Sequence, residues 1–311
     1  MLLLAACALA SLVAAVACGS SGCLVGSADV FWALRLPRAL SAFAVGALLS
    51  LAGALMQVLL RNPLADPYVL GVSGGAATGA MLAMLLAPAA LVLWSVHAGA
   101  LAGAILATGL LFALARSTLV RGQADVAGVR LILTGVMIAA GFGAVMTLLL
   151  SLAPDARLRG MIFWLMGDLE NNVLYAPAWL TLTLTLLWSC WHAGRLNILA
   201  HGDSTAQLLG IAVQRLRTQT LLMASVATAI AVAVAGTIGF VGLVVPHALR
   251  LVLGNDQRLL LPACALAGGL ALTLADLLAR TVVAPVQLPV GVITALIGVP
   301  VFLWLLARGR A

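Results

Sequence analysis

Apolar segments long enough to cross a bilayer follow one another along this chain, with short polar connections between them. From Arg38 to Leu60 the only side chains that are neither apolar nor small are Arg38 and Gln57, and a helix of that length crosses a hydrocarbon core of about 30 Å. Pro37 favours the start of this helix, because its missing N–H would be unpaired in a first turn. The RNPLADP segment at 61–67 is predicted to form a tight loop, since each proline disfavours helical backbone in the residue before it.

The same pattern predicts about ten membrane-spanning helices in one polytopic, all-α domain over residues 1–311. The expected spans cover 1–19, 38–60, 69–87, 94–115, 131–152, 175–191, 218–238, 239–253, 259–279 and 288–306. The expected connections are an outer loop at 20–34, a polar segment at 116–130, a charged loop at 153–160 with a short interfacial helix after it, and a long polar connection at 192–217.

Composition supports a membrane protein and bears on its orientation. With 64% hydrophobic and 8% charged residues, the chain is unlike soluble domains, in which about 25% of residues are charged. All sixteen basic residues are arginines. They lie mostly between the apolar segments, so we interpret them as topology signals and expect no nucleic-acid partner. Most fall in inner loops when the termini are placed in the cytoplasm, and the exceptions are Arg35, Arg38, Arg157, Arg159 and Arg280.

Candidate reactive groups are sparse. The five cysteines show no metal-ligand spacing and are expected to be packing residues, with a Cys18–Cys23 disulfide outside the membrane as the alternative. His247 follows Pro246 without a second ligand at helical spacing, so we expect a packing contact there and no metal site. No nucleophile with a base and an orienting group can be assembled, which argues against an enzyme.

The source of energy must lie outside this chain. It lacks the G-x-x-x-x-G-K-[ST] motif and contains no lysine at all, so it cannot form a P-loop. Another subunit or an ion gradient must drive transport. Gradient-driven carriers usually place ionisable groups at mid-membrane, and the span centres offer almost none. A gradient-driven carrier of a small organic solute therefore remains the second hypothesis, ahead of an intramembrane enzyme.

Small residues gather on particular helix faces and predict either a transport path or close packing. Gly71, Gly75 and Gly79 recur every four residues and predict a smooth ridge, whereas the glycines at 236, 239 and 242 predict a loosened start to the eighth span. The residues predicted to line the path are Gly46, Ser50, Gly53 and Gln57 on the second span with Ser73 and Thr78 on the third.

Long motifs carry a family resemblance over nearly the whole chain. RLPR, NPLADP and LGVSGGAATGA, with GTIGFVGLVVPHALRL at 236–251, LLPACALAGGLALTLADLLAR at 260–280 and LPVGVITALIGVPVFLWLL at 288–306, resemble the FecCD-type permease subunits of type II ABC importers. The resemblance implies a homodimer in a bacterial inner membrane, with two cytoplasmic ATPase subunits and a periplasmic binding protein. It implies alternating access for a ferric siderophore, haem or cobalamin, without choosing among them. ATP and Mg would bind the ATPase, and no cofactor would bind this chain.

The resemblance also assigns roles to charged residues. In this family, arginines of the RLPR and ADLLAR motifs meet glutamates of the binding protein, which here implies Arg35, Arg38 and Arg280. A cation in the first turn of a helix is disfavoured by the helix dipole, so Arg38 needs a negative partner. The alternatives are lipid phosphate or a pair inside the protein, such as Asp276 with Arg280 at i, i+4.

The connection at 192–217 is the second candidate site. Gly202-Asp203-Ser204 predicts an N-cap, and Gly210 a C-terminal end, for a helix of under two turns, with a second short piece at 211–217. Such short helices are unstable alone and must pack on something. The segment is similar to the family's coupling helices, which seat in the ATPase. The implied contacts are Asp203, Ala206, Gln207, Leu208, Leu209 and Gly210. Asp66 is expected to cap the third span, with ATPase contact as the alternative.

Overall fold

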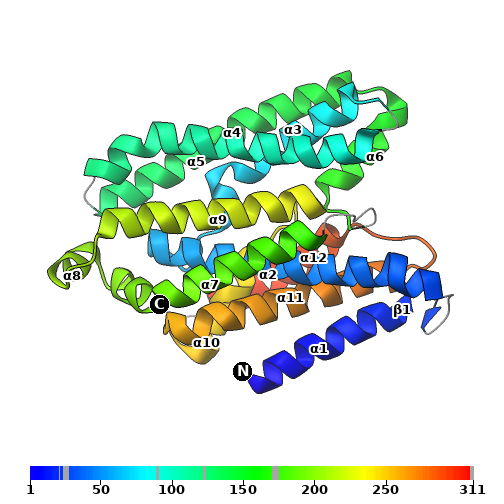
Figure 1. Cartoon of the computed structure of the whole chain (residues 1–311). Helices are drawn as coiled ribbons and strands as arrows, with labels where there is room; N and C mark the ends of the chain where they lie inside the picture. Colours follow the sequence, from blue (N-terminus) through cyan, green and yellow to red (C-terminus); the bar gives the residue numbers. More distant parts are fainter. Residues whose placement is uncertain (21, 24–27, 89–90, 122–123, 170–174, 309–311) are drawn as a thin grey trace.

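The computed structural model describes residues 1–20, 22–23, 28–88, 91–121, 124–169 and 175–308, which form a bundle of long helices (Figure 1). The elements are α1 (Leu2–Ala17), β1 (Cys18–Gly19), β2 (Gly22–Cys23), η1 (Val30–Arg35), α2 (Leu36–Leu60), η2 (Pro67–Leu70), α3 (Val72–Leu86), α4 (Val92–Arg121), α5 (Ala124–Leu152), α6 (Asp155–Leu165), α7 (Tyr175–Ala200), α8 (Asp203–Leu208), α9 (Val213–Ala235), α10 (Val241–Leu253), α11 (Gln257–Thr281) and α12 (Val290–Arg308).

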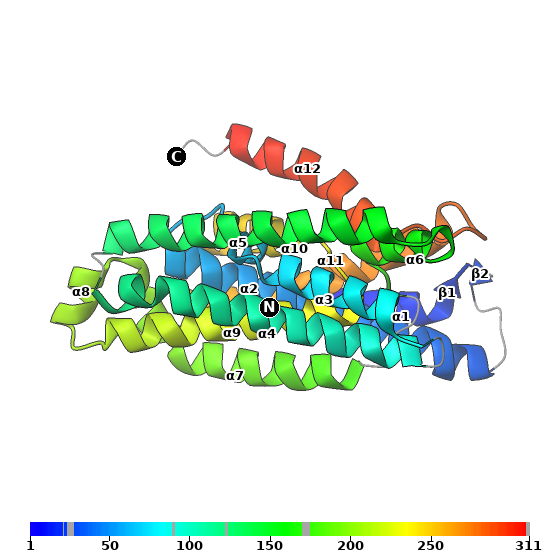
Figure 2. The same cartoon turned by 90° about the horizontal axis from the view of Figure 1, so that it is seen from above.

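The helices run roughly along one direction, so the bundle has two ends. The small β1–β2 hairpin and α6 lie at one end, here called the hairpin end, and α8 lies at the other, here called the α8 end (Figures 1 and 2). The two strands pair antiparallel, with Cys18 opposite Cys23. The two candidate sites of the sequence therefore lie at opposite ends of the molecule.

Helix α2 is the centre of the bundle. Every residue from Ser41 to Leu59 is buried, and α11, α9, α7 and α10 pack around it. The backbones approach closely at glycines, because a Cβ on Gly46 would overlap the carbonyl oxygen of Gly268 in α11. Small residues allow such contacts between helices when lipid supplies no hydrophobic driving force.

The predicted glycine ridge packs α3 against α4. Gly75 and Gly79 lie against Gly103 and Gly99, with no room for a side chain on either partner, which confirms the ridge at these two positions. Gly71 has a different role. It lies between η2 and α3, as the C-cap residue of the first and the N-cap residue of the second. Its φ of +76° is in the left-handed region, which glycine adopts without strain.

The loosened segment before α10 is also confirmed. Residues 236–239 are not helical, and other loops pair with this region. The Tyr68 hydroxyl both donates to the Ile238 carbonyl and accepts from the Ile238 N–H, each at 2.9 Å. The Asp168 N–H donates to the Ala235 carbonyl at 2.9 Å. Irregular backbone at membrane depth is tolerated where it is buried in protein and paired in this way.

Several predicted boundaries are wrong, most of them at polar ends of helices. Helix α7 continues to Ala200 and α9 begins at Val213, so the connection predicted at 192–217 shrinks to a turn around α8. Residues predicted as loops at 116–121, 124–130 and 155–160 are helical, and η1 leads directly into α2. Polar side chains mark where a helix leaves the apolar layer, whereas the backbone hydrogen bonds continue beyond that point.

The all-helical class is confirmed, whereas the count of ten spans stays a prediction. Five helical segments of the described chain are long and apolar enough to cross a membrane, namely Val30–Leu60, Val92–Leu114, Arg130–Leu152, Val213–Ala235 and Gln257–Thr281. Shorter apolar helices are Leu2–Ala17, Val72–Leu86, Val241–Leu253 and Val290–Leu305. Unlike α2, helices α5 and α12 carry exposed leucines and valines along their length, so their apolar faces are open to lipid or to another subunit.

Candidate functional site

At the hairpin end, two arginines share one buried carboxylate. Arg38 Nε lies 3.0 Å and Nη2 2.9 Å from Asp276 Oδ1, and Arg280 Nε lies 3.0 Å from Asp276 Oδ2. Arg38 Nη1 also donates to Gln287 Oε1 at 2.6 Å. The side chain of Asp276 is fully buried. Because a buried charge needs a partner, Asp276 joins the start of α2 to the end of α11.

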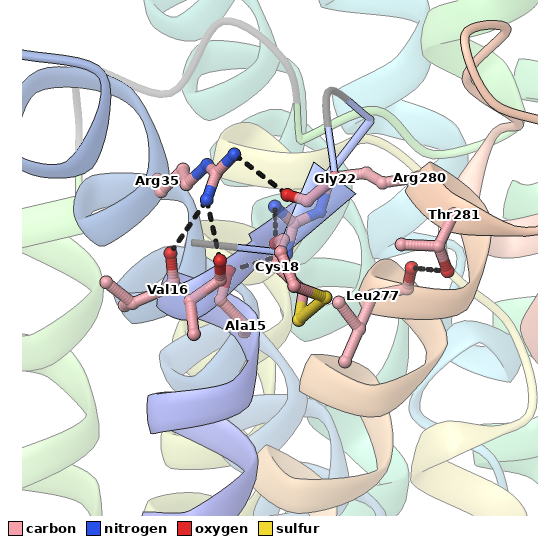
Figure 3. The surroundings of a disulfide bond; sticks show 10 residues. Ala15, Val16, Cys18, Gly22, Arg35, Leu277, Arg280 and Thr281 are labelled. Atoms are coloured by element: carbon pink, nitrogen blue, oxygen red, sulfur yellow. Dashed lines mark hydrogen bonds between the residues drawn. A yellow bond between two sulfur atoms is a disulfide. The ribbon is translucent and has the colours of Figure 1, made fainter. Parts of the chain in front are cut away.

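Two arginines also cap the C-terminus of α1. Arg35 Nη1 donates to the Ala17 carbonyl at 2.7 Å, and Arg280 Nη2 donates to the Ala15 carbonyl at 3.1 Å (Figure 3). The last carbonyls of a helix lack partners within it and carry partial negative charge, so cations stabilise them. The adjoining hairpin is closed by a Cys18–Cys23 disulfide, which was the alternative prediction for these cysteines.

The predicted docking residues are therefore engaged inside the protein. Arg35 and Arg280 are buried, and Arg38 keeps only 12% of its side chain exposed. The Asp276–Arg280 pair that the sequence offered as an alternative is present. Contact between these arginines and a binding protein stays a prediction. Sequence reasoning missed Gln287, which lies in the connection after α11 and has no motif of its own.

At the α8 end, a single short helix carries the second candidate site. Gly202 and Gly210 flank α8 with φ of +125° and +75°, and Gly210 has the C-terminal position that the sequence predicted. The N-cap lies within the segment Gly202-Asp203-Ser204, as the sequence predicted. Gly202 is the N-cap residue, and among the described residues no side-chain hydrogen bond caps α8. The Asp203 carboxylate is instead bound by arginines of other elements.

We call the residues Arg61, Asp203 and Arg217 the Asp203 clasp. Arg61 Nη2 binds Asp203 Oδ1, and Arg217 Nη1 lies 3.2 Å from Asp203 Oδ2. Arg61 ends α2 and Arg217 lies near the start of α9. The clasp therefore ties α8 to the central helix and to α9. The sequence indicated the clasp only through polar residues that follow or precede different spans at the same end of the bundle.

The tip of α8 is apolar and exposed. Leu208 is 89% and Leu209 62% exposed, whereas Ala206 is buried against the bundle. A hollow of about 630 Å³ opens beside the tip, lined in part by Gln207, Ile211 and Arg215. Exposed apolar surface of this kind marks contacts with proteins or with membrane when it forms part of a larger patch.

The residues on α2 that are predicted to line a path are buried between helices. Gly46, Ser50, Gly53 and Gln57 are all buried, and Gln57 bonds the Leu243 carbonyl and Arg250 of α10 at 3.3 and 3.2 Å. In this structure these four positions pack helices together, and their place along a transport path stays a prediction. The two predicted path residues on α3, Ser73 and Thr78, are half-buried. The Thr78 hydroxyl donates to the Gly74 carbonyl at 2.9 Å.

The remaining candidate residues have structural contacts. Asp66 Oδ1 accepts the Tyr68 N–H at 2.7 Å, so it caps η2, which leads into α3. The His247 ring meets Phe302 edge-on, with 6.3 Å between centroids, as expected of a packing contact. Within the described ranges, no three His, Cys, Asp or Glu residues gather where they could hold a metal ion.

Known proteins resemble this chain over nearly its full length. The model of the FecCD transport family matches residues 2–308. The vitamin B12 import system permease protein BtuC of Citrobacter koseri is 42% identical over 281 residues, which are 90% of this chain and 83% of that protein. BtuC of Escherichia coli O9:H4 is also 42% identical, covering 90% and 84% of the two chains.

Solved structures share the architecture. An inward-facing metal-chelate type ABC transporter superposes with a TM-score of 0.88 at 28% identity, covering 98% of this chain and 97% of that chain. PsaBC from Streptococcus pneumoniae, solved in complex with Fab, superposes with a TM-score of 0.60 at 16% identity, covering 88% and 92%. At that identity the second likeness concerns the fold alone.

Proposed function

We propose a cargo and an assembly for this chain, which belongs to the FecCD transport family and is the permease subunit of an ABC importer. It is a multi-pass membrane protein and a transport subunit, and a separate ATPase hydrolyses the ATP that drives it. Its partners are ATPase and binding-protein components. The gradient-driven carrier that the sequence left open is thereby set aside.

The proposed cargo is cobalamin or a closely related corrinoid. One observation carries this choice among the three chelate classes: the relatives at 42% identity over 90% of the chain are vitamin B12 import permeases. The metal-chelate transporter of similar fold is less similar in sequence, at 28%. A ferric siderophore and haem remain the competing cargoes.

The proposed orientation places the hairpin end in the periplasm and the α8 end with both termini in the cytoplasm of a bacterium. The Cys18–Cys23 disulfide supports this orientation, because disulfides persist in the periplasm and are reduced in the cytoplasm. The exposed Leu208 and Leu209 support a hydrophobic contact of α8 with the ATPase, which holds ATP and Mg.

The proposed assembly is a homodimer with two ATPase subunits and one binding protein, working by alternating access. The exposed apolar residues of α5 and α12 favour burial against a second copy and lipid. At the hairpin end, Arg38 and Arg280 share the single charge of Asp276, so this group is net positive. That excess favours acidic side chains on the binding protein, which would compete with the α1 carbonyls for Arg35 and Arg280.

Transport in liposomes tests the cargo. The permease is reconstituted with its ATPase and binding protein, and ATP hydrolysis and uptake are measured with cobalamin, haem and a ferric siderophore. Stimulation and uptake with cobalamin alone are expected. Uptake of haem alone, or of the siderophore alone, would identify that chelate as the cargo in place of cobalamin. Uptake that persists without the ATPase would overturn the ATP-driven mechanism. Binding protein without ligand is the control.

A further inference from the structure

Helix α8 has few connections to the rest of the protein. It spans only the six residues Asp203–Leu208, too few for stability by its own hydrogen bonds, and glycines of positive φ flank it on both sides. Its side-chain anchors are the buried methyl of Ala206 and the carboxylate of Asp203. A displacement of α8 therefore acts on the bundle through these few contacts.

Asp203 is the anchor that reaches other helices by charge. Its carboxylate binds Arg61 through one oxygen and Arg217 through the other. Only 26% of the Arg61 side chain, 14% of the Asp203 side chain and 10% of the Arg217 side chain are exposed. Ion pairs so protected from water are screened less by salt than surface pairs, and charge-assisted hydrogen bonds restrict both distance and direction.

Arg61 is fixed to the central helix. Its N–H donates to the Val58 carbonyl at 3.3 Å, and the next N–H, of Asn62, donates to the Gln57 carbonyl at 3.2 Å. These bonds hold the Arg61 backbone at φ +48° as the C-terminal cap of α2. A shift of Asp203 therefore moves the end of α2 and not a loose loop.

Helix α2 connects the two ends of the molecule. Its 25 residues give a length of about 37 Å, and glycine contacts lock it against α10 and α11. Its opposite end carries Arg38, which binds Asp276 and Gln287. Close-packed interiors transmit displacement without absorbing it, so α2 links the clasp at one end to the arginine group at the other.

We propose that Asp203 is a positioning residue that transmits motion of α8 to α2 and α9, so that the Asp203 clasp couples ATP hydrolysis to transport. The proposal rests on the proposed contact between α8 and the ATPase. It predicts that breaking the clasp leaves the ATPase bound and active but lowers the amount of cargo moved per ATP. A clasp with a purely structural role would lower the amount of assembled transporter and leave that ratio unchanged.

The test compares Asp203→Asn with Asp203→Glu in the reconstituted transporter. Asparagine keeps the shape and removes the charge, and glutamate keeps the charge. We expect Asp203→Asn to lower cobalamin uptake per ATP about fivefold or more, the range of ordinary coupling between sites, with ATPase copurification unchanged. Asp203→Glu should restore most of the ratio. An unchanged ratio in Asp203→Asn would overturn the proposal.

Asp256→Asn is the matched control. Asp256 lies at the same end of the bundle, where it accepts hydrogen bonds from Asn197 Nδ2 at 2.7 Å and from the Arg258 N–H at 3.0 Å. These bonds lower the pKa of its carboxyl. Its hydrogen-bond partners belong to α7 and α11, so its loss should leave uptake per ATP unchanged. A fall equal to that of Asp203→Asn would overturn the proposal.

Two further variants separate the clasp from its premise. Arg217→Gln should lower the ratio. Combining it with Asp203→Asn should add nothing, because Asp203→Asn already removes the charge that Arg217 binds; full additivity would overturn the clasp as a unit. Leu208→Ser with Leu209→Ser should release the ATPase. If it stays bound and transport is normal, the α8 contact and the clasp proposal both fail. If it is released and Asp203→Asn keeps a normal ratio, only the clasp proposal fails.

Discussion

Gly53 of α2 faces the backbone of Gly242 of α10 with no space for a side chain between them. A Cβ on Gly53 would overlap the Gly242 carbonyl oxygen, and this neighbour is backbone, which cannot rotate away. The contact lies where α10 begins, after the non-helical segment 236–239. Separation of α2 from α10 would also weaken the bonds of Gln57 to Leu243 and Arg250.

Gly53→Ala is therefore expected to destabilise the detergent-solubilised permease. Overpacking of this kind costs about 1–3 kcal/mol, which should appear as a lower temperature of aggregation in size-exclusion measurements. Gly141→Ala is the control, because within the described structure a Cβ on Gly141 meets no atom beyond its own stretch of helix within 4 Å. Equal aggregation temperatures of the two variants would show that α2 and α10 do not pack as closely as this contact requires.

The buried carboxylate at the hairpin end gives a second prediction. Asp276→Asn leaves Arg38 and Arg280 without the charge that they share. Breaking a buried ion pair by removing one partner costs about 3–5 kcal/mol, so we expect a sharp loss of folded permease after membrane extraction. Asp155→Asn changes an exposed acid in the first turn of α6 and should be well tolerated. Normal thermal stability of Asp276→Asn would contradict the pairing.

The disulfide gives a third prediction. Cys18 and Cys23 should resist maleimide labelling in unreduced protein and become labelled after reduction, because their thiols are joined. Cys18→Ser with Cys23→Ser should lower stability by only about 2 kcal/mol, since the closed loop is short. The comparison is made in a background without Cys7 and Cys190, which are exposed. Labelling of unreduced protein would show that the bridge is absent.

Docking of the binding protein gives a fourth prediction. Arg38→Gln should weaken binding-protein affinity about tenfold, equivalent to 1.4 kcal/mol, and most strongly at low salt, because charges across an interface are screened by ions. Arg159→Gln removes an exposed arginine of α6 at the same end of the bundle and should have a much smaller effect. Binding is measured by surface plasmon resonance on nanodisc-embedded permease. Equal affinities for both variants would argue against docking at the arginine group.

The strongly apolar pattern made α2 predictable, whereas polar ends concealed the extent of other helices. The pattern placed α2, its proline-marked start and the loop after it, because a buried span leaves no ambiguity in the sequence. It ended the sixth span near Trp191, although α7 continues to Ala200. The reason is that Asn197, beyond the apolar part, bonds Asp256 and the Gln257 N–H. Such distant partners are invisible in a local pattern.

Side-chain roles were harder to predict than helices. Small residues on α2 suit a path or a packing face equally well, and the sequence alone does not show that α10 and α11 pack against them. Asp203 has the local signature of an N-cap, yet its carboxylate binds Arg61 and Arg217. A long-range ion pair competes with a cap for the same oxygens, and the sequence alone cannot show which arrangement prevails.

The non-helical stretch before α10 constrains how the protein is made. Its polar backbone groups would be unpaired in lipid, at a cost of several kcal/mol each. Here Tyr68, Leu165 and Asp168, all synthesised earlier, bond with residues 235–238. The Gly167 carbonyl next to them accepts from the Val290 N–H, which is made later. We therefore expect insertion of α9 and α10 to be coupled to their packing on the earlier elements that supply these partners, so that insertion and tertiary assembly proceed together.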